Sequence, residues 1–216
     1  MNPKLLEQFF VRDDEEKDFG LLIDLTHRCA LECPRCQRQE FFRDHGETVW
    51  GGDIPMDTIE KATDTFKAIN FGGQLSDPIH HPNFIEILKL CYEKGVQANV
   101  QTASTGKPKR WFIKAFEANP NARWQFGIDG LPEESHKYRI NQDGPKLFQI
   151  MCEAKNYLKK LPCWQYIIFK YNEEHIEQAK QMAKDNGLRF VLMQSHRWRG
   201  ENDPYMPSEK YRLEAL

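Results

Sequence analysis

Short apolar runs alternate with amphipathic stretches along most of this 216-residue chain, and this alternation constrains the fold more than any other feature. The apolar runs predict strands at 21–25, 68–71, 96–101, 124–130, 163–169 and 189–193. A strand followed by a helix roughly every thirty residues is typical of parallel β/α units. About six such units are too few for a closed eight-stranded barrel. We therefore predict an α/β fold, a partial (β/α)6 TIM-like barrel of parallel strands, with its site at the C-terminal ends of the strands.

The predicted barrel covers residues 21–193 and is flanked by two shorter segments. An N-terminal extension at 1–20 is expected to begin as an amphipathic helix and to continue through a solvated acidic turn. Residues 37–52 form a polar, partly aromatic excursion after the first strand. A C-terminal tail at 194–216 carries Arg197, Trp198 and Arg199. The tail either closes over the mouth of the barrel or packs on its outside.

The composition is that of an ordinary globular protein, with 40% hydrophobic residues, 29% charged residues and a net charge of −2. This balance argues against a dominant nucleic-acid footprint, although a local basic patch is compatible with it. The N-terminus has neither a signal-peptide core nor an apolar run long enough to span a bilayer. Cysteines without an export signal fit a reducing compartment. We expect a cytoplasmic protein with no membrane partner.

Three cysteines follow the first strand closely, at Cys29, Cys33 and Cys36, in a C-x3-C-x2-C spacing. A loop can turn three such thiols toward one inorganic centre. A four-iron cluster normally takes four thiolates, so three would leave one iron open for a small molecule. A zinc site would need a fourth ligand, which His27 or His45 could supply. An odd number of cysteines argues against a disulfide set.

This spacing, after a strand near the N-terminus, resembles the signature of the radical SAM superfamily. The resemblance implies a [4Fe-4S] cluster on the three cysteines, with S-adenosylmethionine (SAM) chelated to the open iron. One position departs from the pattern, because Arg35 stands where the family usually has an aromatic residue. The chain looks closest to short radical SAM proteins encoded in phage and marine bacterial genomes. It also resembles the subgroup of molybdenum-cofactor and peptide-modifying enzymes.

Later strand ends resemble further motifs of the same family. Gly72, Gly73 and Gln74 stand where the family carries Gly-Gly-Glu, which contacts the amino group of the methionine. Gln74 can still accept a hydrogen bond from that amine but supplies no charge. Asp77 either contributes negative charge to the same contact or orders the turn before a proline. The resemblance places a further pair of hydroxyls near the SAM ribose, although they could equally cap the next helix. This pair is Thr102 and Ser104.

The segment 127–139 resembles the Ser-x-Asp-Gly…His-x-x-Arg pattern of that subgroup. Asp129 belongs to this motif, and Arg139 falls where an arginine of the family binds the SAM carboxylate, a contact that suits a guanidinium. Gly127 replaces the serine of the pattern, which leaves only backbone groups there. The end of the 163–169 strand and the following asparagine match the sixth unit of the family barrel, beside adenine. This implies SAM contacts at Phe169 and Asn172.

The resemblance implies an enzyme that takes one electron from an external reductant such as flavodoxin or ferredoxin. SAM cleavage would give a 5′-deoxyadenosyl radical that abstracts hydrogen from a peptide, a protein side chain or a small molecule. A nucleoside, nucleotide or RNA substrate is the alternative, weakly supported by basic residues at 107–110 and 197–199. A non-catalytic zinc- or SAM-binding module is a third reading. The scattered Cys91, Cys152 and Cys163 predict no second cluster.

Overall fold

The computed structural model describes residues 20–212, and a single parallel sheet forms their centre. The six strands lie in sequence order, and each neighbouring pair is parallel. They are β1 (Gly20–Ile23), β2 (Ala68–Phe71), β3 (Gln97–Thr102), β4 (Arg123–Gly127), β5 (Cys163–Ile168) and β6 (Arg189–Gln194). This arrangement confirms the predicted partial barrel of parallel strands.

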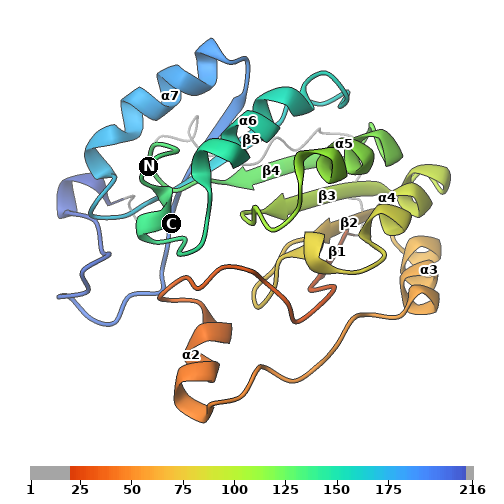
Figure 1. The fold of residues 1–216 in the computed structure, drawn as a ribbon, viewed down its shortest axis with the longest axis horizontal. Coiled ribbons are helices and arrows are strands. Elements are labelled where there is room, and N and C mark those ends of the chain that lie inside the picture. Colours follow the sequence, from red (N-terminus) through yellow and green to blue (C-terminus); the bar gives the residue numbers. More distant parts are fainter. Residues whose placement is uncertain (1–19, 213–216) are drawn as a thin grey trace.

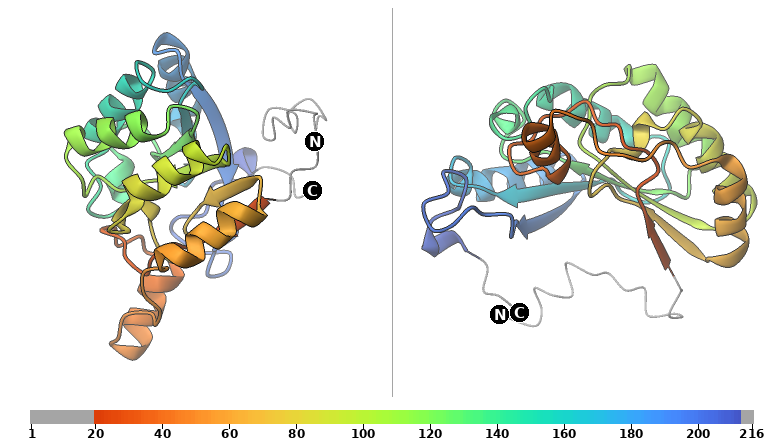
Figure 2. Two further views of the ribbon diagram at one scale, coloured as in Figure 1. Left: turned by 90° about the vertical axis from the view of Figure 1, so that its right-hand side faces the viewer. Right: turned by 90° about the horizontal axis from the view of Figure 1, so that it is seen from below.

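Helices between consecutive strands cover one face of the sheet (Figure 1). They are α3 (Met56–Thr65), α4 (Phe84–Glu93), α5 (Lys109–Ala118), α6 (Gly144–Ala154) and α7 (Ile176–Asp185). Figure 2 shows these helices on the same side of the sheet. Among the described residues no helix covers the other face, which we call the open face. The one-sided arrangement follows from the handedness of parallel strand–helix–strand connections.

The core lies between the sheet and these helices. Successive strand side chains alternate between the two faces, so every second residue points to the helices. Trp124 of β4 is buried there, with Phe116 of α5 at 4.9 Å and Phe84 of α4 at 6.3 Å between ring centroids, both edge-on. Each such aromatic contributes about 1.5–3 kcal/mol by its burial. This packing fixes the strands, and thereby the loops at their C-terminal ends.

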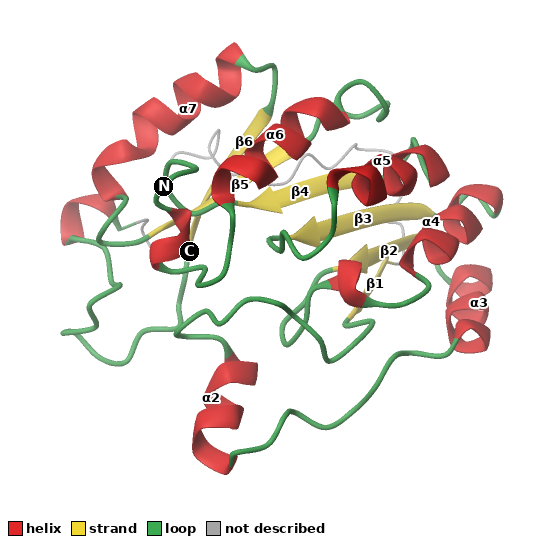
Figure 3. Cartoon of the chain, in the orientation of Figure 1, coloured by secondary structure: helices red, strands yellow, loops and turns green. Residues whose placement is uncertain are grey.

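The structure departs from the sequence prediction mainly after β1. Residues 37–52 were expected to form an irregular excursion, but α2 (Gln37–His45) is a helix, shown separately from the sheet in Figure 3. None of its residues is buried, so its sequence lacks the periodic apolar stripe from which a helix can be predicted. Gly46 ends the helix at φ 71°, with its N–H donated to the carbonyl of Phe42 at 2.8 Å.

Helix α6 begins at Gly144 because Asp143 caps it, accepting a hydrogen bond from the Lys146 N–H at 3.1 Å. Strand β1 ends at Ile23, before the predicted limit. The expected helix and acidic turn at 1–19 lie outside the described residues. Within 20–212 no helix has the length and apolar character needed to cross a bilayer.

Candidate functional site

The predicted site residues follow the C-terminal ends of successive strands. Gly72 comes directly after β2, Thr102 ends β3, Gly127 ends β4 and Phe169 comes directly after β5. The cysteine loop, residues 29–36, follows β1. Because the strands are parallel and adjacent, all of these ends lie along one edge of the sheet.

The thiols of the cysteine loop lie close enough to influence one another. Burial raises the pKa of Cys29 to about 12, and the neighbouring Cys33 adds to this effect. Burial likewise raises the pKa of Cys33, with a further contribution from Cys36. The Cys36 N–H donates to the Cys33 carbonyl at 3.1 Å in a tight turn. A thiol becomes a metal ligand as the thiolate, so a bound cation would have to offset the raised pKa values of Cys29 and Cys33.

No three His, Cys, Asp or Glu side chains within 20–212 are grouped as they would be around a single metal ion. A four-iron cluster spreads its thiolates over different irons, so its ligands stand farther apart than those of one zinc. His45, a suggested fourth zinc ligand, stacks on Phe41 near the end of α2 with 4.3 Å between ring centroids. Its Nδ1 contacts the Phe41 carbonyl at 3.0 Å.

Asp77 is a buried carboxylate that joins two loops. It accepts hydrogen bonds from the Thr102 hydroxyl at 2.9 and 3.0 Å. It also accepts from the N–H groups of Ala103 at 2.9 Å and Ser104 at 3.0 Å. Its own N–H donates to the Arg28 carbonyl, next to the cysteine loop, at 3.0 Å. These contacts favour the loop-ordering role for Asp77, and SAM contacts of Asp77 and Thr102 stay predictions.

Ser104 is fully buried, and its hydroxyl lies 2.9 Å from Nε2 of His80. It also accepts the N–H of Gly106 at 3.2 Å. Burial lowers the pKa of His80, which favours a neutral imidazole at this contact, although Asp77 opposes that effect. Sequence reasoning did not identify His80, because its partner lies 24 residues away on another loop.

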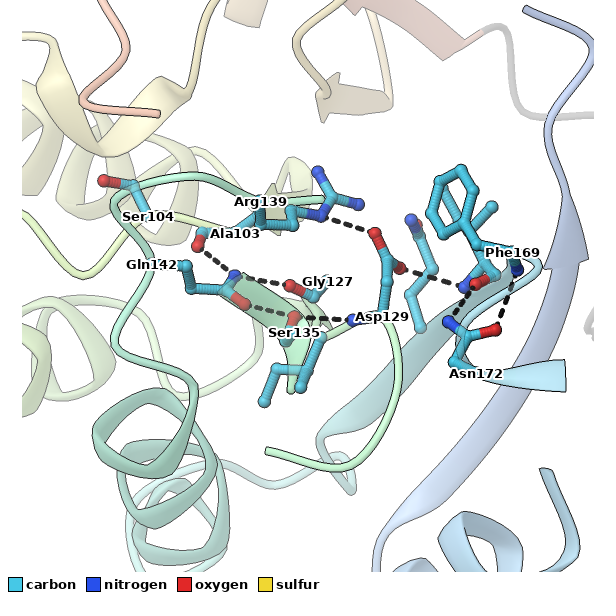
Figure 4. A network of polar contacts seen from close by, with 12 residues as sticks. Ala103, Ser104, Gly127, Asp129, Ser135, Arg139, Gln142, Phe169 and Asn172 are labelled. Carbon is cyan, nitrogen blue, oxygen red and sulfur yellow. Dashed lines mark hydrogen bonds and ion pairs between the residues drawn. The ribbon is translucent and has the colours of Figure 1, made fainter. Parts of the chain in front are cut away.

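Asp129 and Arg139 form a buried ion pair, with Nε of Arg139 donating to Oδ2 at 2.7 Å (Figure 4). The other oxygen of Asp129 accepts the Ile167 N–H at 2.9 Å, which links β4 to β5. The guanidinium packs over Gly127, where an added Cβ would lie 3.0 Å from Nη2. Arg139 also lowers the pKa of Cys33, in opposition to burial. Arg139 thus stands between the cysteine loop and the end of β4.

Gln142 is a buried residue of this region that sequence reasoning missed. Its Nε2 donates to the carbonyls of Ala103 at 2.6 Å and Gly127 at 2.8 Å, which joins the ends of β3 and β4 (Figure 4). Its Oε1 accepts the hydroxyl of Ser135, which in turn accepts the Asp129 N–H at 2.8 Å. Polar loop residues carry no periodic signal, so only the structure brings these groups together.

Phe169 and Asn172 shape the end of β5. Both are fully buried. Asn172 accepts the Phe169 N–H at 2.7 Å and donates to the Ile167 carbonyl at 3.0 Å. The Phe169 ring stacks on Tyr138 with 3.9 Å between centroids. The adenine contacts expected of both residues stay predictions.

The glycine loop, residues 72–76, is held by Asp24, another residue that sequence reasoning missed. Asp24 follows β1 and accepts the Gln74 N–H at 3.1 Å and the Ser76 hydroxyl at 2.7 Å. Gly73 has no room for a side chain, because a Cβ there would lie 1.6 Å from the Ser76 carbonyl oxygen. The side-chain oxygen Oε1 of Gln74 accepts a hydrogen bond from Nη2 of Arg197 at 2.6 Å.

The C-terminal tail packs against the cysteine loop. Arg35 donates through Nε to the buried Asp203 at 2.8 Å, and its guanidinium lies 5.4 Å from the ring centroid of Tyr205. Burial disfavours ionisation of Asp203, but Arg35 and two backbone N–H groups outweigh it and hold its pKa below the ordinary value. Beside this contact, a cavity of about 350 Å³ lies between the tail and the start of α2, and it is lined by Arg35, Gln37, Glu40, Arg197, Trp198 and Arg199.

No protein-family model matches the chain. A PqqA peptide cyclase from Ruegeria pomeroyi is 23% identical over 207 residues, which cover 91% of this chain and 53% of that protein. A tungsten-containing aldehyde ferredoxin oxidoreductase cofactor-modifying protein from Pyrococcus furiosus is 28% identical over 86 residues, 39% of this chain and 24% of that protein. The chain is a relative of the peptide-modifying radical SAM enzymes.

Solved radical SAM structures share the fold. SuiB of Streptococcus suis bound to S-adenosylmethionine superposes with a TM-score of 0.64 at 14% identity, covering 89% of this chain and 44% of SuiB. The protein anSMEcpe with bound AdoMet gives a TM-score of 0.67 at 15% identity, covering 87% of this chain and 53% of that protein. The chain spans about half the length of the cyclase from Ruegeria pomeroyi.

The residues at the strand ends suit a radical SAM cofactor set. Burial raises the pKa values of Cys29 and Cys33, and the Arg139 guanidinium lies beside Cys33, where its positive charge favours the thiolate. Nε of Arg139 donates to Asp129, which fixes the orientation of the guanidinium. Its two terminal nitrogens are then left to donate to a carboxylate. Gly127, a departure from the family pattern, gives this guanidinium room. The donor set therefore fits a cluster next to a carboxylate-bearing ligand.

Proposed function

We propose that this chain is a radical SAM enzyme that modifies a peptide or protein side chain. The observation that carries the proposal is the position of Arg139, a buried guanidinium beside Cys33 and over Gly127. It brings a carboxylate-recognising group next to the cysteine loop. Held by the three loop cysteines and by Arg139, a [4Fe-4S] cluster and SAM would supply one-electron chemistry for hydrogen abstraction from the substrate.

The chain's own groups hold and orient these cofactors. Cys29, Cys33 and Cys36 supply thiolates, and Arg139 binds the methionine carboxylate through its terminal nitrogens. The glycine loop presents backbone groups to the methionine amine, and the Gln74 carbonyl remains an acceptor while Arg197 donates to it. The electron comes from an external carrier of the flavodoxin or ferredoxin type.

The substrate class rests on the relatives. The protein from Ruegeria pomeroyi is a peptide cyclase, and SuiB and anSMEcpe have both been solved with peptides bound. A peptide is therefore the substrate we propose here, ahead of a nucleotide or RNA. The basic residues once considered for RNA include Arg197 and Arg199, which bond to Gln74 and Glu40.

Anaerobic reconstitution with iron and sulfide, followed by dithionite reduction with SAM, tests the proposal. The expected result is about four irons per chain and formation of 5′-deoxyadenosine and methionine. A variant with alanine at all three loop cysteines should lose both, whereas Cys152→Ala should keep both because Cys152 lies on α6. A protein that holds its cluster and binds SAM yet releases no 5′-deoxyadenosine would instead be a SAM-binding module.

A further inference from the structure

Side-chain amides gather on the open face of the sheet. The neighbouring strand residues Phe71, Val100, Trp124 and Trp164 are buried against the helices, so the residues between them project to the opposite face. Five of these projecting residues carry amides, and we call them the amide row. They are Asn70, Asn99, Gln101, Gln125 and Gln165.

The strand register brings the amide row together. Asn70 is paired with Asn99 across β2 and β3, and Gln101 with Gln125 across β3 and β4. Nδ2 of Asn99 donates to Oδ1 of Asn70 at 2.9 Å, and Nε2 of Gln125 donates to Oε1 of Gln165. Asparagine is disfavoured in strands, so packing preference alone does not explain two asparagines side by side.

The amide row is not internally satisfied. Oδ1 of Asn99 is buried and has no hydrogen-bond partner among residues 20–212. Leaving a buried acceptor unpaired costs about 1–3 kcal/mol. Gln101 is exposed at the centre of the same row. The row therefore combines an acceptor that lacks a donor with an amide that is open to solvent.

We propose that the amide row binds the backbone of an extended peptide substrate, an inference that rests on the proposed function. A side-chain amide presents one acceptor and two donor hydrogens without charge, which matches the carbonyl and N–H of a peptide group. The five amides offer an anionic nucleotide no charge to neutralise its phosphate, and the cation beside them, Arg123, which is paired with Asn99, already has an interaction of its own. The chemistry of the row therefore favours a peptide over a nucleotide.

The dimensions of the row suit a short extended segment. Neighbouring strands lie about 4.8 Å apart, so the distance from β2 to β5 is about 14 Å, which corresponds to about four extended residues. The row also reaches the glycine loop, because a Cβ at Gly72 would lie 3.0 Å from Oε1 of Gln101. A peptide on the amide row would therefore lie directly beside the predicted SAM position.

Nuclear magnetic resonance of the reconstituted 216-residue chain with an oxidised cluster tests this inference. The probe is N-acetyl-tetra-alanine amide, and the comparators are its ester analogue, in which oxygen replaces the backbone N–H groups, and adenosine monophosphate. The peptide should shift the side-chain amide signals of Asn99, Gln101 and Gln125. The ester should bind about fivefold more weakly for each hydrogen bond of about 1 kcal/mol that it loses.

Variants sharpen the same measurement. Asn99→Leu with Gln101→Met keeps side-chain size and should weaken peptide binding about tenfold or more, for two lost hydrogen bonds. Gln101→Met alone, at an exposed position that does not endanger folding, should weaken it several-fold. The control Gln181→Leu changes an exposed amide of α7, on the helix-covered side, and should bind the peptide like the wild type.

Three results would overturn the inference: equal peptide binding by the double variant, amide signals that respond to adenosine monophosphate but not to the peptide, or signals that move when residues 1–19 are deleted. The last result would mean that the chain's own N-terminal segment fills the row. A failure of the proposed function is distinguishable, because it appears as absent 5′-deoxyadenosine in the wild type while the amide signals still respond to the peptide.

Discussion

The cysteine loop and the loops that end β3, β4 and β5 differ in how their polar groups are satisfied. Asp77, Asp129, Gln142 and Asn172 are buried, and each makes several hydrogen bonds, those of the first three to neighbouring loops and those of Asn172 within the end of β5. In the cysteine-loop region, by contrast, the thiols are half-buried, and burial raises the pKa values of Cys29 and Cys33. The helix that follows, α2, has no buried residue.

The two sides of the site are therefore stabilised in different ways. The loops that we propose face SAM are ordered by the chain's own hydrogen bonds, so we expect them to keep their geometry without a cofactor. The cysteine loop holds thiols whose raised pKa values at Cys29 and Cys33 favour the neutral form, and a bound cation would favour the thiolates instead. We therefore expect the cluster to stabilise the loop, and the intact strand ends to hold SAM in place.

Among these predictions, substitution of the loop cysteines should have the largest effect. Alanine at Cys29, Cys33 or Cys36 should abolish stable cluster binding and 5′-deoxyadenosine formation, because each ligand holds a different iron. The melting temperature of the iron-free protein should change little, because the loop contributes little to the core. Iron content and calorimetry measure both effects. A large drop in the melting temperature of the iron-free variants would show that the loop is already part of the ordered core.

Breaking the Asp129–Arg139 ion pair should instead destabilise the fold. Asp129→Asn leaves the Arg139 guanidinium buried without its countercharge, which costs about 3–5 kcal/mol. Urea unfolding of the iron-free protein measures this loss. Glu177→Gln, which removes an exposed ion pair with Lys180, is the control and should leave the unfolding free energy unchanged. Equal unfolding free energies for the two variants would show that the Asp129–Arg139 pair does not stabilise the loops at the ends of β4 and β5.

A methyl group in the glycine loop should affect ligand binding more than folding. Gly73→Ala places a Cβ 1.6 Å from the Ser76 carbonyl oxygen, so the loop must move. SAM affinity should fall about tenfold, equivalent to about 1.4 kcal/mol. Gly52→Ala meets nothing within 4 Å and serves as the control in the same equilibrium-binding assay. If the Gly73→Ala variant binds SAM as tightly as the wild type, the glycine loop does not contact SAM.

The smallest expected effect concerns the docking of the tail. Glu173 accepts hydrogen bonds from the Ser208 N–H and hydroxyl, both at 2.6 Å, and from Lys170 at 2.9 Å. Burial disfavours ionisation of Glu173, but these donors outweigh it and hold its pKa below the ordinary value. Their stabilising contribution is therefore complete above the ordinary glutamate pKa of about 4.3 and is lost as the pH falls through the lower folded value.

Hydrogen exchange of residues 205–212, corrected for the pH dependence of the chemical rate, should therefore rise in acid. Glu173→Gln should raise the exchange already at pH 7, by about 1 kcal/mol of local opening free energy. Asp57→Asn changes a carboxylate of α3 and should not alter exchange in the tail. A tail that exchanges at the same rate in Glu173→Gln and wild type would show that other contacts hold it.

The sequence predicted the parts of the molecule that follow a periodic pattern. The bounds of β2 agree with the predicted 68–71, because apolar spacing and the glycine residues that follow define them. Contacts between loops were not predictable in this way. Asp24 and Gln142 act on residues far away in the chain, and nothing in their immediate sequence distinguishes them from ordinary polar loop residues. Helix α2 was missed because it has no buried face.

Electron paramagnetic resonance of the reduced, reconstituted protein tests the central claim most directly. The account predicts the signal of one [4Fe-4S]⁺ cluster per chain, and a change in that signal when SAM binds to an iron that no cysteine occupies. The change should be lost in the variant with alanine at Cys29, Cys33 and Cys36, together with the cluster itself. A colourless protein with one tightly bound zinc, or a cluster signal that SAM leaves unaltered, would contradict the account.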